Sequence, residues 1–364
     1  MIKEENKIKT FSFFSVLISF SLVFFLAEIF FRYKYLGFDK YSFNQEMFSL
    51  KNWNSHYSFH TDKWPVELDS NLGWKLKTGN HTNNNPWKTI VNIDEHGFRK
   101  NKPVDSINYY KKTAVFLGDS YTFGDGVNDS ETFPAFFQSL SGKNVLNAGV
   151  PAYGIDQIYL RAIQLLEKYN ISEIFFCFIP DDIIRCNYSI LNGVKKPFFR
   201  FNNKNLEYVG ISGDPLLKTK INLFQKYGGF SFFIHTVMKN FANEYWLRPT
   251  SIGFKKEHNE GEEVSAHLLN KLKIICEENN VKLYLVPLMS RLSRPLPEKL
   301  SNEIKKKFVI ININEKFEKI QMENNSLWNK LYNNNIYNKN DKLHFSPLGN
   351  EYIAKSIFSK LQSE

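Results

Sequence analysis

Four short segments of this sequence place side chains that can do acyl chemistry directly after apolar stretches or turns. They are Gly118-Asp119-Ser120, Asn147-Ala148-Gly149, Pro180-Asp181-Asp182 and Asp341-Lys342-Leu343-His344. Serine, histidine and aspartate are the groups of nucleophilic catalysis, because a base can take the hydroxyl proton and an acid can orient that base. Each segment alone is an ordinary turn or helix cap. Their joint order along the chain is what indicates a nucleophilic site.

Short apolar runs separated by helical patterns must position these segments. The runs lie at 113–117, 143–146, 173–179, 282–286 and 308–313, and the helical patterns at about 131–140, 155–169, 263–279, 297–306 and 347–361. Such runs are typical of strands that are buried on both faces of a parallel sheet. The alternation predicts an α/β fold, a three-layer α/β/α sandwich with a mostly parallel five-stranded sheet. Three of the four segments then fall at the carboxyl ends of strands, where open α/β sheets carry their sites.

With these residues the sequence resembles the SGNH/GDSL hydrolases, a superfamily of serine esterases and acyl hydrolases. The matching residues are Gly118-Asp119-Ser120-Tyr121-Thr122-Phe123-Gly124, Asn147-Ala148-Gly149-Val150-Pro151 and Asp341-Lys342-Leu343-His344-Phe345-Ser346-Pro347. The resemblance covers about 113–361 and leaves 187–262 unmatched. The pieces Leu72-Gly73-Trp74 and Gly97-Phe98-Arg99, with an apolar N-terminus, are similar to membrane-anchored bacterial members. Many of those members are linked to acyl groups on cell-surface polysaccharide.

The resemblance implies a role for each site residue. Ser120 is the expected nucleophile at the start of a helix, His344 the general base and acid, and Asp341 the acid that orients the imidazole. The backbone N–H groups of Ser120 and Gly149 are expected to face the oxyanion, where losing one donor typically costs about 10²–10³ in rate. No cofactor and no catalytic metal are expected.

Asp181 departs from the family pattern, in which an asparagine side chain donates to the oxyanion. An ionised carboxylate only accepts hydrogen bonds and would repel an oxyanion. Three explanations stay open: Asp181 is protonated and donates, another donor such as Asn187 or Asn147 replaces it, or the site is weakened or inactive. We expect Asp181→Asn to keep or raise esterase activity.

The stretch from Phe11 to Phe31 is apolar or serine except for Glu28. At 1.5 Å per residue it spans about 30 Å, the thickness of a bilayer core, and Arg32 can pair with Glu28 at the headgroups. The run exceeds the h-region of a cleaved signal peptide and has no good cleavage site, so an uncleaved anchor is favoured. Lys3, Lys7 and Lys9 before the span, against Arg32 and Lys34 after it, favour an extracytoplasmic (periplasmic) body.

The expected organisation is therefore a cytoplasmic tail and transmembrane anchor at 1–37, a β-rich extension at 38–112 and a hydrolase domain at 113–364. An insertion at about 187–262 interrupts the last. Its aromatic residues are expected to be mostly core, with a lid over the site as the alternative: Phe198, Phe199, Phe201, Tyr208, Phe230, Phe232 and Phe233. Cys177 and Cys186 can form a disulfide outside the cytoplasm or stay buried thiols.

Composition excludes several other classes. The 364 residues include 47 Lys+Arg and 37 Asp+Glu, a net charge of +10, but the lysines form no basic stripe, so no nucleic-acid partner is expected. The sequence contains no Gly-x-Ser-x-Gly, Walker or His-Glu-x-x-His motif. His56, His60, His81 and His96 precede the main domain, where a metal site is conceivable but surface or core histidines are favoured.

The sequence as a whole predicts a membrane-anchored serine esterase that hydrolyses O-acyl esters, with O-acetyl groups on cell-surface carbohydrate as the expected substrate. Two alternatives stay open. In an O-acyltransferase, a sugar hydroxyl instead of water resolves the acyl-enzyme. In a non-catalytic glycan-binding or assembly protein, the fold is retained without the chemistry, as the Asp181 departure suggests. The sequence does not determine the oligomeric state.

Overall fold

The computed structural model describes residues 2–36, 64–83, 85, 87, 89–102, 108, 111–215, 222–242, 245–246, 255–289, 296–332 and 344–363. Asp341, His56 and His60 lie outside these residues. The chain forms two compact units. One consists of Met1–Ser58 and Leu217–Phe254, and the other of Phe59–Leu216 and Lys255–Glu364. Residues of the expected β-rich extension from 59 onward therefore belong to the same unit as the expected hydrolase domain.

The larger unit is built on a five-stranded sheet in which every neighbouring pair is parallel. Its strands are β5 (Thr113–Leu117), β6 (Val145–Asn147), β7 (Ile171–Phe178), β13 (Lys282–Pro287) and β14 (Val309–Ile310), in the order β14-β13-β7-β5-β6. All five correspond to the apolar runs of the sequence, although β14 is shorter than expected. The predicted fold class is confirmed.

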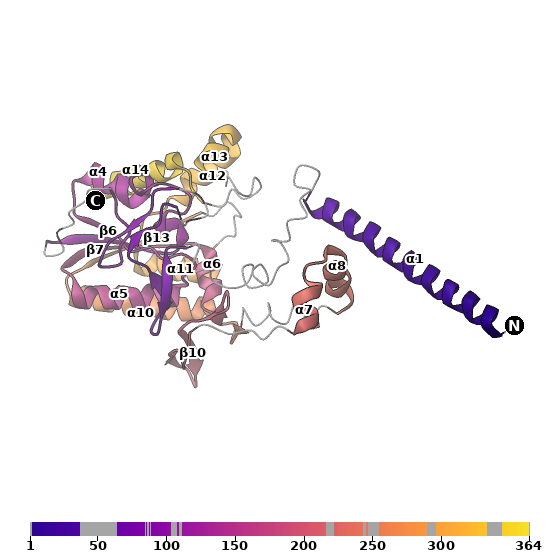
Figure 1. The fold of residues 1–364 in the computed structure, drawn as a ribbon. Coiled ribbons are helices and arrows are strands. Elements are labelled where there is room, and N and C mark those ends of the chain that lie inside the picture. Colours follow the sequence, from indigo (N-terminus) through magenta and orange to yellow (C-terminus); the bar gives the residue numbers. More distant parts are fainter. Residues whose placement is uncertain are drawn as a thin grey trace. The chain divides into compact units, whose positions relative to one another are not determined.

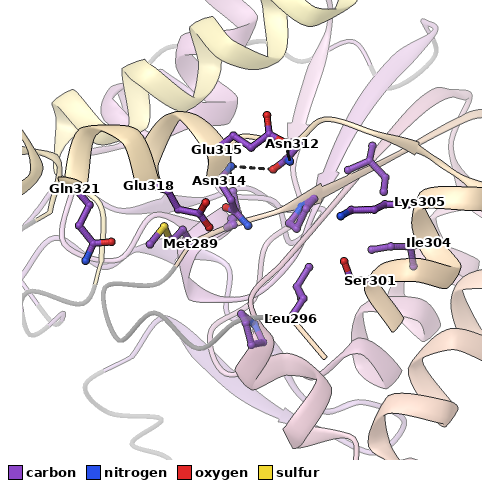
Figure 2. Close-up of a pocket in the computed structure, with 14 residues that line it drawn as sticks. Met289, Leu296, Ser301, Ile304, Lys305, Asn312, Asn314, Glu315, Glu318 and Gln321 are labelled. Carbon is purple, nitrogen blue, oxygen red and sulfur yellow. Dashed lines mark hydrogen bonds between the residues drawn. The ribbon is translucent and has the colours of Figure 1, made fainter. Parts of the chain in front are cut away.

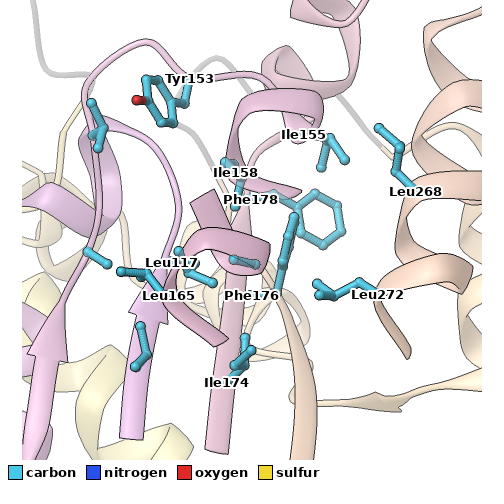
Figure 3. Packing of buried hydrophobic residues seen from close by; sticks show 14 of the residues in the cluster. Leu117, Tyr153, Ile155, Ile158, Leu165, Ile174, Phe176, Phe178, Leu268 and Leu272 are labelled. Atoms are coloured by element: carbon cyan, nitrogen blue, oxygen red, sulfur yellow. The ribbon is translucent and has the colours of Figure 1, made fainter. Parts of the chain in front are cut away.

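Helices cover both faces of this sheet (Figure 1). On one face lie α4 (Phe133–Ser141) and α14 (Pro347–Gln362), and on the other α5 (Ile155–Lys168) and α10 (Gly261–Glu278). Alternate residues of β5 point to opposite faces, with Val115 in one buried cluster and Phe116 in the other. Figure 3 shows strand residues such as Phe176 packed among side chains from α5 and α10. Because both faces are covered, the strands are apolar throughout instead of alternating.

The remaining helices of the larger unit come after the sheet strands in the chain. They are α3 (Ser120–Phe123) after β5, α6 (Pro180–Arg185) after β7, and α11 (Glu298–Lys307), α12 (Asn314–Glu323) and α13 (Asn325–Leu331) on either side of β14, with a 3-10 turn at Asp129–Glu131. The short strands form antiparallel pairs outside the main sheet: β1 (Val66–Asp69), β2 (Gly73–Leu76), β3 (Gly79–Asn80), β4 (Asn92–Ile93), β8 (Tyr188–Leu191), β9 (Val194–Lys195), β10 (Phe198–Asn202), β11 (Asn205–Val209) and β12 (Lys255–Lys256).

The smaller unit contains α1 (Ile2–Leu36), α7 (Leu223–Gly228) and α8 (Phe232–Phe241). Within α1, Phe11–Lys34 is long and apolar enough to cross a membrane, with a mean hydropathy of 2.3. The insertion expected at 187–262 is thus divided: its β-strands belong to the larger unit and α7 and α8 to the smaller.

All three cysteines are buried free thiols, so Cys177 and Cys186 form no disulfide. Burial raises the pKa of both thiols, which keeps them protonated and unreactive near neutral pH. Of the insertion's aromatic residues, Phe198 and Phe199 are core residues, as expected, and Tyr208 is half exposed.

Candidate active site

Ser120 is the first residue of α3, a single helical turn that follows β5 at the carboxyl edge of the sheet. The carboxylate of Asp119 caps this turn by accepting from the N–H of Tyr121 at 2.9 Å. Gly124 ends it in the left-handed region with φ 93°, and its N–H donates to the carbonyl of Ser120. A residue other than glycine would be strained there. The local sequence therefore fixes a tight strand-to-helix turn with the serine at its start.

Two glycines let neighbouring backbone segments approach this turn. A Cβ at Gly149 would lie 2.3 Å from the backbone nitrogen of Phe123, and one at Gly118 would lie 2.1 Å from Thr122 Oγ1 and 2.7 Å from the carbonyl oxygen of Cys177. Such separations are well inside van der Waals contact. The loop after β6 can therefore pack directly against the backbone of α3 only because residue 149 is glycine.

His344 reaches Ser120 from the other end of the sequence, with 2.9 Å between His344 Nε2 and Ser120 Oγ. The two residues that follow His344 tie it to the end of α13 and the start of α14. Phe345 forms an isolated antiparallel bridge with Tyr332, and Ser346 caps α14 by accepting from the N–H of Gly349 at 3.2 Å. This distance is the geometry that proton transfer from a serine hydroxyl to an imidazole requires.

Aromatic side chains surround the imidazole. The ring centroids of Tyr121 and Trp87 lie 4.8 Å and 6.2 Å from that of His344. Tyr121 is buried, and burial together with the charge of Asp119 raises the pKa of its phenol well above the ordinary value. Tyr121 is therefore a neutral wall of the site and does not compete as a base.

Two buried carboxylates lie close to the Ser120–His344 pair. Asp119 Oδ2 is 3.4 Å from Ser120 Oγ, and Asp125 Oδ2 is 3.8 Å from His344 Nε2. Asp125 is close enough to pair with the imidazole of His344 when the imidazole carries a proton, whereas the contact of Asp119 is with the serine hydroxyl. The third expected triad member, Asp341, lies outside the described residues, so its role stays a prediction.

Arg185 joins the site to the next strand end. Its Nη1 donates to Asp182 Oδ1 at 2.5 Å, to Asp119 Oδ2 at 3.1 Å and to the carbonyl of Tyr153 at 2.9 Å. The guanidinium of Arg185 thus forms ion pairs with two fully buried carboxylates. Burial and the neighbouring charge of Asp119 raise the pKa of Asp182 well above its ordinary value, against the opposing effect of Arg185.

Arg99 holds the other end of the nucleophile turn. Its guanidinium donates to the carbonyls of Phe123 at 2.9 Å and Gly124 at 2.6 Å, and pairs with Asp129 at 3.1 Å. These carbonyls lie at the end of α3, where the last carbonyls of a helix have no partner within the helix, and Arg99 makes the shortest bond to each. Arg161 supports the adjacent loop by donating to the carbonyl of Ala148 at 3.0 Å.

Sequence reasoning missed Arg99, Arg185 and Asp125 as residues of the site. The sequence contains one signal for Arg99, the Gly97-Phe98-Arg99 piece, which by itself indicates only a turn and a family likeness. No pattern at Arg185 connects it to Asp119, because the two meet only through the packing of α6 against α3.

The groups expected to donate to the oxyanion differ in their present hydrogen-bond partners. The N–H of Gly149 points to Asn147 Oδ1 at 3.2 Å, and Asn147 Nδ2 donates to the carbonyl of Phe123 at 3.3 Å. Asn187 accepts from the N–H of Gly261 at 2.8 Å, which places it against the start of α10. Asp181 lies in the first turn of α6, beside Asp182. These hydrogen bonds of the two asparagines are to groups other than Ser120, and the part of Asp181 in the oxyanion site stays a prediction.

The two described histidines of the N-terminal group have other partners. His81 Nε2 lies 2.6 Å from the carbonyl oxygen of Lys77, and His96 Nδ1 lies 3.3 Å from the hydroxyl of Tyr169. Within the described part of the chain, no group of three or more His, Cys, Asp or Glu side chains could hold a metal ion.

A cavity of about 630 Å³ lies at the same edge of the sheet, around the ends of β7, β13 and β14. Pro180 and Pro287 line it where β7 and β13 end, and β7 is the neighbour of β5. Figure 2 shows polar side chains of α11 and α12 around it, among them Lys305, Glu318 and Gln321. Leu288, Met289, Leu296, Ile304 and Ile310 supply apolar lining. Apolar walls with a few polar groups are typical of small-molecule sites.

No family model matches the chain, and no curated protein matches it. Among solved structures, the chain is similar to a protein assigned to the G-D-S-L family of lipolytic proteins from Desulfitobacterium hafniense DCB-2, with 14% identity, a TM-score of 0.36, and coverage of 68% of this chain and 98% of that one. It is similar to the acetyl xylan esterase AlAXEase, with 14% identity, a TM-score of 0.37, and coverage of 68% and 99%.

A third similar structure is a catalytic mutant of an acetylxylan esterase from Geobacillus stearothermophilus, with 8% identity, a TM-score of 0.35, and coverage of 70% of this chain and 96% of that one. In its sequence motifs around Ser120 and His344, the chain resembles GDSL-type esterases.

Proposed function

We propose that this chain is a membrane-anchored serine esterase that removes acyl groups from hydroxyls of carbohydrate. The observation that carries the proposal is the 2.9 Å contact between His344 Nε2 and Ser120 Oγ. It lies at the carboxyl edge of a parallel sheet, where α/β proteins build their sites. The apolar segment Phe11–Lys34 supports the anchor.

In the proposed reaction, Ser120 Oγ attacks the carbonyl carbon of the ester while His344 Nε2 takes the hydroxyl proton. The tetrahedral intermediate collapses by breaking the bond to the sugar oxygen, which leaves with the proton from His344. Water then attacks the acyl-serine, again losing its proton to His344, and releases the carboxylic acid and free Ser120. Asp341 is proposed to hold the other imidazole nitrogen, and the nearby carboxylate of Asp125 favours the imidazolium.

Oxyanion stabilisation is proposed to come from backbone N–H groups at the start of α3 and from Gly149. The 3.2 Å bond from the Gly149 N–H to Asn147 is long and can be exchanged for a charged acceptor, because hydrogen bonds to an oxyanion are stronger than those between neutral groups. Asp181 contributes to this site only in its protonated form.

The cavity beside the ends of β7 and β13 is proposed to bind the carbohydrate part of the substrate. Carboxylate, amide and ammonium groups on its wall suit hydroxyl groups, and its size suits one to a few sugar rings. The same cavity favours the second candidate function, an O-acyltransferase. A sugar hydroxyl held there would resolve the acyl-serine in place of water.

A fluorophosphonate probe tests the catalytic part of the proposal. The full chain in detergent should become labelled, and Ser120→Ala and His344→Ala should not. Ser139→Ala is the matched control, because Ser139 is an exposed serine on α4. Ser120→Ala should also reduce p-nitrophenyl acetate hydrolysis to the uncatalysed background, because losing the nucleophile of such a triad costs about 10⁶-fold in kcat. Absence of labelling in the folded wild-type chain would refute the esterase and favour the non-catalytic alternative.

Glu318→Ala tests the carbohydrate site. We expect it to raise KM for an acetylated xylo-oligosaccharide several-fold, and to leave the rate with p-nitrophenyl acetate unchanged, since that ester has no sugar part. Adding unacetylated oligosaccharide separates the two functions: transfer of acetyl to it supports the transferase, and release of acetate alone supports the esterase.

A further inference from the structure

Glu28 lies in the apolar segment of α1, and its carboxylate accepts three hydrogen bonds from the start of α8. It accepts from Ser231 Oγ at 2.7 Å, from the N–H of Phe232 at 3.1 Å and from the N–H of Phe233 at 3.0 Å. The first N–H groups of a helix have no partner within the helix and carry partial positive charge. A side chain of one helix therefore caps another that is about 200 residues away in the sequence.

Arg32 completes this contact. Its Nε lies 2.8 Å from Glu28 Oε1, its Nη2 donates to the carbonyl of Phe230 at 3.0 Å, and its guanidinium lies 4.8 Å from the ring centroid of Phe232. The side chains of Glu28 and Arg32 are only 15% and 8% exposed. Glu28 and Arg32 thus neutralise each other and both make hydrogen bonds, as charges in or near hydrocarbon must.

The aromatic contacts extend the docking along α1. The ring of Phe233 meets the ring of Phe24 edge-on at 5.5 Å and lies 6.0 Å from that of Phe31. The contact therefore covers residues 24–32 of the apolar segment that ends at Lys34. At 1.5 Å per residue, Glu28 lies about 9 Å from Lys34 along the helix axis, which is the depth of the boundary between headgroups and acyl chains.

Several large apolar side chains of α7 and α8 are left exposed. The exposed fractions are 71% for Leu223, 63% for Tyr227 and 87% for Phe241, and Phe224 is half exposed. Along α8, Phe233, Val237 and Phe241 recur every four residues and share one helix face, while Lys239 and Asn240 are exposed and polar. A helix with one apolar and one polar face is suited to lie in a membrane interface.

We propose that α7 and α8 form an interfacial hairpin held to α1 by Glu28, with Leu223, Phe224, Tyr227 and Phe241 inserted among the lipids. The partner of this surface is the bilayer itself. The proposal rests on α1 being a membrane anchor, as in the proposed function, and is independent of the chemistry at Ser120. In this proposal α7 and α8 bind the membrane instead of covering the active site.

Site-specific quenching by lipid tests the hairpin. Single cysteines at Leu223, Phe241, Lys239 and Val16 are labelled with an environment-sensitive fluorophore in the full chain, in vesicles of phosphatidylcholine and phosphatidylglycerol. The three native thiols are buried, and the unsubstituted chain measures their labelling. We expect spin-labelled lipids to quench positions 223 and 241 at least twofold more than position 239. Position 16, in the middle of α1, reports the anchor.

The outcomes separate the hairpin from the anchor. Quenching at 16 without quenching at 223 and 241 overturns the hairpin and leaves the anchor standing, whereas no quenching at any position refutes the anchor. If 223 and 241 are shielded from aqueous iodide as well as from spin-labelled lipid, protein covers them, and the proposal is wrong. Tryptophan fluorescence during heating of each variant shows whether the larger unit is folded, whatever the chemistry at Ser120.

Glu28 variants test how the hairpin is held. Glu28→Ala removes the acceptor for Phe232 and Phe233 and should reduce lipid quenching at position 241 by about half or more. Glu28→Gln keeps one acceptor oxygen without the charge and should give an intermediate value. Equal quenching in all three forms would show that the Glu28 contact does not hold α8 at the membrane.

Discussion

Replacing Arg185 with methionine should strongly destabilise the larger unit without altering any group that touches the substrate. Arg185 is the one cation that the structure shows bonded to both Asp119 and Asp182, two carboxylates with no exposed surface. Methionine has a similar volume but no charge. Its introduction leaves two buried carboxylates facing each other near the nucleophile turn.

The expected size follows from the burial of the pair. Removing one partner of a buried ion pair costs about 3–5 kcal/mol. At about 2–4 °C per kcal/mol for a domain of this size, the melting temperature should fall by about 6–20 °C. Arg200→Met is the matched control, because its pair with Glu207 at 3.0 Å is half exposed and should contribute less than about 1 kcal/mol.

The stability lost in Arg185→Met should be larger at high pH than at low pH. Burial and Asp119 raise the pKa of Asp182 in the folded chain, so the protonated form is favoured there and ionisation disfavours folding. Stability from this group is fully present below its unfolded pKa of about 3.9 and is lost as pH rises through the folded value. The cost of Arg185→Met should therefore shrink as pH falls from 8 toward 4.5, and Asp182→Asn in the same chain should restore part of the stability.

Tryptophan fluorescence during heating of the detergent-solubilised full chain measures both effects. A drop at pH 7 no larger than that of Arg200→Met would refute the shared-guanidinium interpretation. So would a drop that is the same at pH 4.5 and pH 8, because the reasoning depends on buried carboxylates that gain protons.

Three further variants test the site. Gly149→Ala places a methyl group 2.3 Å from the backbone nitrogen of Phe123 and should cost about 3 kcal/mol of stability and most of the esterase activity; thermal unfolding near wild type would contradict this packing. Asp181→Asn should keep or raise kcat/KM for p-nitrophenyl acetate, since an amide donates to an oxyanion; a large loss would show that the carboxyl is needed. Asp341→Asn should lower kcat by about 10⁴ with little change in KM, as loss of the acid that orients the base does, and a loss under tenfold would assign His344 to another acid.

Local patterns in the sequence were sufficient for the strands and for the position of the nucleophile. The run 113–117 is apolar on both faces, and a glycine and a capping aspartate come directly after it. This pattern predicts a buried strand that ends in a tight turn. Boundaries were less accurate where tertiary contacts set them. The expected strand at 308–313 is only Val309–Ile310, because it is an edge strand with one neighbour and the chain turns at Asn312 into α12.

Ser120 and His344 could be named from the sequence because each belongs to a short motif whose residues act on one another over three or four positions. Arg185, Arg99 and Glu28 could not be assigned in the same way. Arg185 and Glu28 also have local partners in Asp182 and Arg32. The contacts that place them in the fold, to Asp119 and to the start of α8, cross 66 and about 200 residues, and that of Arg99 with Asp129 crosses 30, so nothing in the neighbouring sequence records them. For a buried charge, the required partner is whichever group the fold brings within about 3 Å.

The sequence by itself thus determined the α/β class and the apolar N-terminal segment, and it predicted the serine and histidine of the candidate site. Only the tertiary structure decided the strand order, the 2.9 Å approach of His344 to Ser120, the sharing of Arg185 between two carboxylates and the capping of α8 by Glu28. The physical reason is the range of each interaction. Hydrophobic periodicity and helix caps act between residues close in the chain, whereas buried charges and backbone approaches are satisfied by groups that only the folded chain brings together.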